Sequence, residues 1–167
     1  MSDGSRANPD ANAAPRISYA IARLQQVVLA GVIQRVAPSG LTALQFTTLS
    51  VLGRHGAPLS NSQLARRSFM TPQSMNEVIH RLERDGLIMR KQHPNHRRKF
   101  PASLTAKGRR VLAACERGVG EFEAVMLDSF TPSERAEFLR MLTSAVRNLG
   151  GGFADVKKVA TKTPPET

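Results

Sequence analysis

The sequence predicts a mainly α-helical fold with one small β-hairpin. Apolar residues recur at helical spacing along most of the chain, which is the pattern of amphipathic helices packed on a core. Pro, Gly and Ser or Thr residues stand where these segments begin and end. Two short extended stretches flank a His-Pro-Asn-His turn, which indicates the hairpin.

The first 16 residues are polar and are predicted to form a disordered arm. A helix is then expected from Ile17 to about Val36, closed by Pro38 and Gly40. Its apolar residues at helical spacing are Ile17, Ala20, Leu24, Val27, Val28 and Val32. "LTALQFTTLSVLGRHG" predicts a second helix, with Gly53 and Gly56 closing it. The side chains expected to point inward from it are Leu44, Phe46, Leu49 and Leu52.

"SNSQLARRS" predicts a short third helix, and "TPQSMNEVIHRLERDGL" predicts a fourth. Thr71 is a good N-cap for the fourth helix, and Pro72 suits its first position because the missing N–H is harmless there. One apolar stripe runs along it, at Met75, Val78, Ile79 and Leu82. Gly86 is a natural stop, and extended pieces around Leu87–Lys91 and Lys99–Leu104 form the predicted hairpin.

Two more helices are expected before the chain ends. "LTAKGRRVLAACERGVGEFEAVMLDSF" predicts a long helix whose apolar seam includes Leu112, Cys115 and Val119. "TPSERAEFLRMLTSAVRNLG" predicts the last one, capped by Thr131 with Glu134 completing a capping box. Residues 150–167 are predicted to form a disordered basic tail.

The charge of the protein is concentrated in its middle. The formal net charge is +11, and residues 54–110 alone hold thirteen Lys or Arg against three acids. The flanking segments are nearly neutral. A basic segment between neutral ones is typical of a site for a polyanion, so a nucleic acid is the expected partner.

Several classes of protein are disfavoured. A single cysteine, Cys115, rules out an intramolecular disulfide framework and suits a reducing compartment. No apolar run approaches the roughly 20 residues that cross a bilayer, and the N-terminus lacks a signal-peptide core. We therefore expect a cytoplasmic protein with no membrane partner.

Catalysis is also disfavoured, because the sequence has no G-x-S-x-G, P-loop or H-E-x-x-H motif. A redox or metal-dependent enzyme would have to use Cys115 and the four histidines, but no Cys/His/acid cluster has the spacing of metal ligands. Cys115 is expected to pack in the seam of the long helix. No cofactor or metal is expected, and the protein is not expected to be an enzyme.

The order of two helices, a helix with a polar outer face and a basic hairpin predicts a winged helix-turn-helix. A helix fits the major groove of duplex DNA, while basic groups hold the phosphates. On the fourth helix the residues expected to face DNA are Thr71, Gln73, Ser74, Asn76, Glu77 and His80. Arg90, Arg97, Arg98 and Lys99 are expected to contact DNA from the hairpin, supported by Ser62 and Arg66 on the third helix.

The stretch "VIHRLERDGLIMRKQHPNHRRKFPASLTAKG" resembles the recognition-helix end, the wing and the following LT-x-x-G of the MarR family of bacterial transcriptional regulators. "LTALQFTTLSVLGRHG" and "SNSQLARRSFMTPQSM" sit where the second to fourth helices of that family sit, so the resemblance covers about residues 17–149. Arg97 corresponds to the wing arginine of the family. The family commonly has Asp two residues before it, and Asn95 stands here instead, which cannot form an ion pair with Arg97.

The resemblance implies a homodimer on a palindromic operator, with a DNA-binding lobe at residues 41–104 and dimerisation helices at 17–36 and 105–149. It often implies release by a small-molecule effector, for which Tyr19 and Phe46 are candidate contacts. The apolar first and last helices support a dimer independently, because a small winged domain cannot cover both. The predicted function is a dimeric, sequence-specific repressor; the alternative is a non-specific architectural DNA-binding protein. Whether the protein represses or activates depends on where its operator lies.

Overall fold

The computed structural model describes residues 15–91 and 100–150 of the 167-residue chain. The elements in chain order are α1 (Ile17–Val36), the 3₁₀ helix η1 (Ala37–Ser39), α2 (Ala43–His55), α3 (Asn61–Arg67), α4 (Pro72–Arg84), β1 (Ile88–Arg90), β2 (Ala102–Leu104), α5 (Ala106–Met126) and α6 (Pro132–Asn148). The mainly helical fold with one antiparallel hairpin is confirmed. The arm predicted at the N-terminus, the hairpin turn with Arg97, Arg98 and Lys99, and the tail from residue 151 lie outside the described residues.

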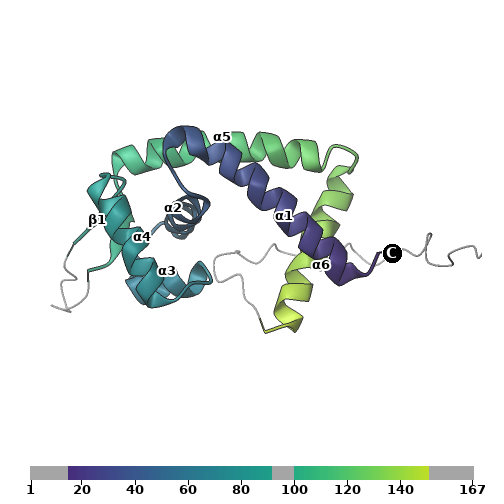
Figure 1. The fold of residues 1–167 in the computed structure, drawn as a ribbon, viewed down its shortest axis with the longest axis horizontal. Helices are drawn as coiled ribbons and strands as arrows, with labels where there is room; N and C mark the ends of the chain where they lie inside the picture. The colour runs from purple at the N-terminus through teal and green to yellow at the C-terminus, as the bar shows by residue number, and fades with distance from the viewer. Residues whose placement is uncertain (1–14, 92–99, 151–167) are drawn as a thin grey trace, which may run out of the picture.

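Figure 1 shows two ends joined by α5. Helices α2, α3 and α4 and the hairpin gather at one end, and α6 stands at the other. Helix α5 runs from the hairpin to α6, and α1 packs against it. The shape therefore separates a compact lobe from a pair of terminal helices.

Each of the helices α2 to α6 begins at a side-chain cap. The N-cap hydroxyls that accept a backbone N–H three residues on belong to Thr42, Ser60, Thr71, Thr105 and Thr131. The predicted caps at Thr71 and Thr131, and the capping box between Thr131 and Glu134, are confirmed. These bonds satisfy N–H groups that have no partner within the helix.

The hydrophobic core lies mainly in the lobe, and α5 packs over it. On α4 the predicted stripe is confirmed, since Met75, Ile79 and Leu82 are buried and Val78 is partly buried. Cys115 is buried in the seam of α5, as predicted. Because the buried stripe packs on the core, the opposite face of α4 is held outward, toward solvent.

The expectation that Leu44 points inward is wrong, because 38% of this side chain is exposed. The stripe of α2 that meets the core consists of Gln45, Thr48, Leu49 and Leu52, at i, i+3, i+4 and i+7. Leu44 lies one turn before the buried Thr48 and on the same side of α2, but it belongs to the first turn of the helix and stays exposed to solvent there. The hydroxyl of Thr48 is accommodated in the core because it donates to the carbonyl of Leu44 at 2.9 Å.

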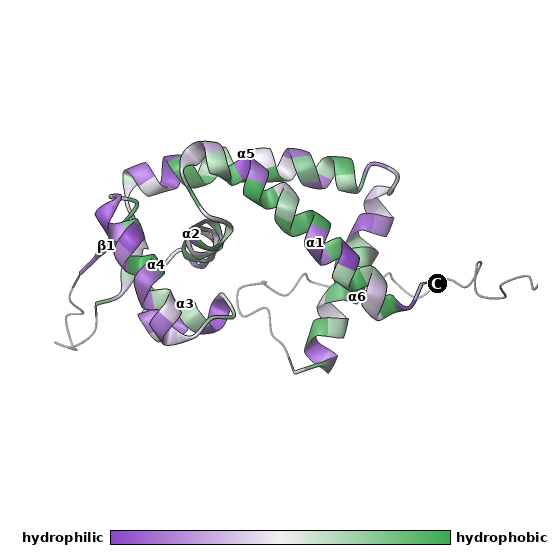
Figure 2. Cartoon of the chain, in the orientation of Figure 1, coloured by the Kyte–Doolittle hydropathy of each residue, from purple (hydrophilic) through white to green (hydrophobic). Residues whose placement is uncertain are grey.

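The expectation that no segment approaches membrane-spanning length is also wrong. Residues Ile17–Ser39 have a mean hydropathy of 1.2 and are long and apolar enough by length and composition alone. Only 6% of the apolar window is buried, and Figure 2 shows hydrophobic residues along α1. Arg23 and Gln26 form a 3.2 Å hydrogen bond in the middle of the helix, where polar groups are costly in hydrocarbon.

Candidate nucleic-acid interface

Helices α3 and α4 form a helix-turn-helix unit whose two N-termini are joined by a side-chain bond. Asn61 Nδ2 at the start of α3 donates to the carbonyl of Pro72 at the start of α4, at 3.0 Å. Leu64 and Met75 are fully buried, one on each helix. The unit therefore holds the N-terminal end of α4 in a fixed position, and this is the end of a recognition helix that contacts bases.

The outer face of α4 carries the six residues expected from the sequence. All six side chains of this recognition face are exposed: Thr71, Gln73, Ser74, Asn76, Glu77 and His80. Thr71 and Ser74 are engaged with each other, since the hydroxyl of Thr71 donates to Ser74 Oγ at 2.9 Å and caps its backbone N–H. Within the described part of the chain, the side-chain amides of Gln73 and Asn76 make no hydrogen bond, so they can pair with a ligand.

The later part of the recognition face borders a polar hollow of about 480 Å³. Glu77 and His80 line it from α4 together with Arg81 and Arg84. The opposite wall is formed by the start of α2, with Gly40, Thr42 and Gln45. Arg81 Nε forms an ion pair with Asp85 Oδ2 at a distance of 3.5 Å. The hollow therefore carries charges of both signs beside the recognition face.

Arg90, which the sequence assigned to DNA contact from the wing, has a partner inside the protein. Its Nε donates to Glu83 Oε2 at 2.9 Å and its Nη2 donates to the same oxygen. The guanidinium is half-buried, and this pair fastens β1 to the end of α4. The hydrogen bond from Arg90 lowers the pKa of the Glu83 carboxyl from its ordinary value of 4.5, although partial burial opposes the shift.

We expect the Glu83–Arg90 pair to make stability pH-dependent at the acid end. A carboxyl whose pKa falls on folding contributes stability above its unfolded-state pKa and loses it as the pH drops through the lower folded value. Glu83→Gln should therefore lower the free energy of unfolding by about 1 kcal/mol or less at pH 7, because the pair is partly exposed to solvent. Urea unfolding between pH 3 and pH 7 should show this difference shrinking below about pH 4.5. Glu121→Gln, on an exposed part of α5, is the matched control; equal pH profiles for the two variants would contradict the role of the pair.

The root of the hairpin is fixed to α5 by the segment that follows it. Strands β1 and β2 pair antiparallel with Ile88 opposite Leu104. The hydroxyl of Thr105 donates to the carbonyl of Gly86 at 2.7 Å and also caps the N–H of Gly108. A Cβ at Gly108 would lie 1.9 Å from the carbonyl oxygen of Leu87, so only glycine allows this close approach. The hairpin is therefore anchored to the start of α5.

The other candidate contacts are more scattered. Ser62 and Arg66 are exposed on α3, as supporting DNA contacts require. Among the described residues no group of three or more His, Cys, Asp or Glu could hold a metal ion. Phe69, an exposed aromatic residue in the turn between α3 and α4, was not among the residues predicted to contact DNA. The signal in the sequence is that α3 ends without the glycine that usually follows a helix.

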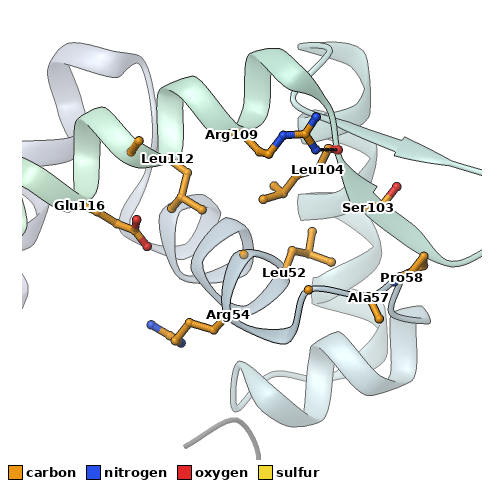
Figure 3. Close-up of a pocket in the computed structure, with 12 residues that line it drawn as sticks. Leu52, Arg54, Ala57, Pro58, Ser103, Leu104, Arg109, Leu112 and Glu116 are labelled. Carbon is orange, nitrogen blue, oxygen red and sulfur yellow. Dashed lines mark hydrogen bonds between the residues drawn. The ribbon is translucent and has the colours of Figure 1, made fainter.

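Two cavities lie where α2 meets α5. The larger, of about 520 Å³, is shown in Figure 3, where Leu52, Leu104 and Leu112 surround it and Arg109 stands above Leu104. The smaller, of about 320 Å³, is lined by Phe46, as well as by Ser50 and Arg54. Ser50 Oγ is buried without a hydrogen-bond partner. Tyr19, the other candidate for ligand contact, is exposed on α1 and lines neither cavity.

The packed α3–α4 unit, the exposed polar face of α4 and the antiparallel hairpin define a winged helix-turn-helix protein. The model of the MarR family matches residues 39–99. The HTH-type transcriptional repressor Rv2887 of Mycobacterium tuberculosis is 36% identical over 126 residues, which cover 75% of this chain and 90% of that protein. The chain belongs to the MarR family of transcriptional regulators.

Other relatives agree with this assignment. The HTH-type transcriptional repressor NicR of Pseudomonas putida is 28% identical over 116 residues, covering 68% of this chain and 71% of that protein. Among solved structures, the repressor CouR bound to a 23-mer DNA duplex has a TM-score of 0.71 at 28% identity, covering 78% and 92% of the two chains. Apo MarR from E. coli shares the fold, with a TM-score of 0.68 at 21% identity over 80% and 99%. These relatives are transcriptional repressors or regulators and not enzymes.

Proposed function

We propose that this protein is a dimeric, sequence-specific repressor that binds a palindromic operator in double-stranded DNA and is released by a small ligand. The observation that carries the proposal is the recognition face of α4, which is exposed and polar beside an anchored hairpin. The solved complex of the related repressor CouR with a DNA duplex supports DNA as the partner. Such a protein would act in the cytoplasm, where bacterial DNA is.

The chemistry of the recognition face supports the reading of bases. The amides of Gln73 and Asn76 can each form two hydrogen bonds with an adenine, and the carboxylate of Glu77 can accept from the amino group of a cytosine. An acid is costly near phosphates unless it reads a base, so Glu77 favours a specific binder over an architectural one. Residues 41–104 would form the DNA-binding lobe. Arg97, Arg98 and Lys99 of the hairpin would add phosphate or minor-groove contacts, because they are basic.

Asn76→Ala or Gln73→Ala is expected to weaken binding to the cognate operator by about 1–3 kcal/mol and to relax specificity at one base pair. The loss on random DNA should be much smaller, because no base is read there. Fluorescence anisotropy with cognate and scrambled duplexes at one fixed salt concentration measures both. Equal losses on the two duplexes would remove the substituted residue from the set that reads bases.

The terminal helices support a dimer. Ile21, Leu29 and Ile33 on α1 and Leu139 and Met141 on α6 are exposed large apolar side chains. An exposed apolar surface of this kind usually marks an interface between subunits. In a twofold dimer through residues 17–36 and 105–149, the two copies of α4 would enter successive major grooves about 34 Å apart.

The 320 Å³ cavity supports release by a ligand. Phe46 offers an apolar surface, Arg54 a positive charge and Ser50 an unused hydroxyl, which together suit a small organic molecule with a polar group. A ligand in this cavity would contact α2 of the lobe and α5 at once. The dimer can hold its two lobes at a spacing that fits DNA or at one that does not. The ligand causes release only if its affinity is higher for the second conformation than for the first. Tyr19 would contribute only from a partner subunit.

The experiment that tests the proposed function is selection from a randomised duplex library at physiological salt. Enrichment of an inverted repeat with half-sites about one helical turn apart is the expected result. If all sequences bound alike, with affinity falling steeply as salt rises, the protein would instead be a non-specific architectural DNA-binding protein. The observation that favours this second function is the high positive charge of the protein, which attracts any DNA sequence.

A further inference from the structure

Phe69 has an unusual backbone conformation at the end of α3. Its φ is +54°, and it is the one non-glycine residue with positive φ among those that the structure describes. The N–H of Met70 donates to the carbonyl of Ala65 at 2.9 Å, which is the bond that closes a helix in a Schellman motif. Phe69 therefore occupies the left-handed position after the helix, where glycine is the usual residue.

The ring of Phe69 makes this position more costly still. Its exposed fraction is 69%, so a large apolar surface faces water at a residue that already carries backbone strain. A glycine would remove both costs without disturbing the hydrogen bond that closes α3. Residues held in strained conformations gather at functional sites, because the fold alone gains nothing from them.

Phe69 lies in the chain just before the recognition face. It precedes the N-cap Thr71 by two residues, so the two Cα atoms lie no more than about 7 Å apart. Arg66, three residues before Phe69 on α3, is exposed. The surrounding segment of the chain is strongly basic. The exposed apolar residues of α1 and α6 belong to the helices that run to the other end of the molecule (Figure 1).

We propose that Phe69 is a DNA-contacting residue whose ring packs against apolar surface of the operator at the edge of each half-site. Duplex DNA offers such surface in two places, the 5-methyl group of thymine in the major groove and the face of deoxyribose beside it. Burial of the ring against either one offsets the exposure that the free protein carries. This inference rests on the proposed function, because it requires an operator.

The variant that tests it is Phe69→Gly, which should affect folding and binding in opposite directions. The melting temperature should stay equal or rise, because glycine suits the left-handed position. Affinity for the selected operator should fall about tenfold. The dependence of affinity on salt should keep its slope, because no phosphate contact is lost; Arg66→Ala, on the same helix-turn-helix unit, should instead lower that slope by about one unit. Leu44→Ala, another exposed apolar side chain, should leave affinity unchanged.

Operators with deoxyuridine in place of each thymine separate the two DNA surfaces. If wild-type affinity drops at one position while that of Phe69→Gly does not, the ring contacts a thymine methyl group. If neither protein responds and Phe69→Gly still binds more weakly, the ring contacts deoxyribose. Equal operator affinity of the variant and the wild type, or a variant that dissociates into monomers, overturns the inference. A wild-type protein that selects no sequence overturns the proposed function itself, which is a different result.

Discussion

Gly108→Ala is expected to lower the melting temperature by about 5–10 °C. The new Cβ would lie 1.9 Å from the carbonyl oxygen of Leu87 and 2.9 Å from its carbon, and both atoms belong to the backbone of the hairpin root. No rotation of a side chain relieves such a contact, so α5 and β1 must move apart. Overpacking of this kind costs about 3 kcal/mol, which for a chain of this length corresponds to the stated shift. The better helix propensity of alanine, about 1 kcal/mol, offsets part of the cost.

The chain offers a matched control in the same helix. Gly120 is exposed on α5, and a Cβ there would meet nothing within 4 Å. Gly120→Ala should therefore raise stability by about 0.5–1 kcal/mol, because alanine loses less conformational freedom in a helix. Thermal unfolding followed by circular dichroism measures both variants. Equal melting temperatures for the two would show that the hairpin root is not held as tightly against α5 as the structure indicates.

Gly108→Ala should also weaken operator binding beyond its effect on stability. The hairpin is fixed to the lobe at this place, so the direction of β1 and the position of Arg90 depend on it. Binding measured well below the melting temperature separates the two effects. An unchanged affinity would mean that the hairpin directs no DNA contact.

Leu139→Glu is expected to break the proposed dimer and to reduce operator affinity by at least about 100-fold. Leu139 lies in the middle of α6 with 56% of its side chain exposed, so a glutamate costs the single protomer little. In a dimer the same position would bury a charge without a partner, which is strongly unfavourable. A monomer also loses the gain from binding two half-sites through one molecule.

Sedimentation equilibrium should show half the wild-type mass for Leu139→Glu, with unchanged helix content. The T-shaped contact of Phe130 with Phe138, 5.6 Å between ring centroids, should keep α6 at the end of α5 in the monomer. Leu44→Glu is the matched control, because Leu44 is also exposed but lies on α2 in the lobe. A Leu139→Glu variant that sediments as a dimer would remove α6 from the interface.

The sequence was informative wherever a local rule decides the structure. Caps such as Thr71 and Thr131 depend on one side chain and an N–H three residues away, and the stripe of α4 depends on helical period alone. Family membership followed from the same local signals, because the hairpin and the LT-x-x-G after it occur in a fixed order. Gln73, Ser74, Asn76, Glu77 and His80 could be recognised as outward-facing because they lie off the buried stripe of α4.

The sequence by itself determined the class of protein, the helices, the hairpin and the polar outer face of α4. Only the tertiary structure decided that Leu44 faces solvent, that Arg90 is engaged by Glu83 and that Gly108 touches the backbone of Leu87. It also showed that Phe69, two residues before the N-cap of α4, is exposed and has a positive φ. The physical reason is that periodicity reports one helix at a time, whereas burial, ion pairing and close approach depend on which residues of distant segments meet.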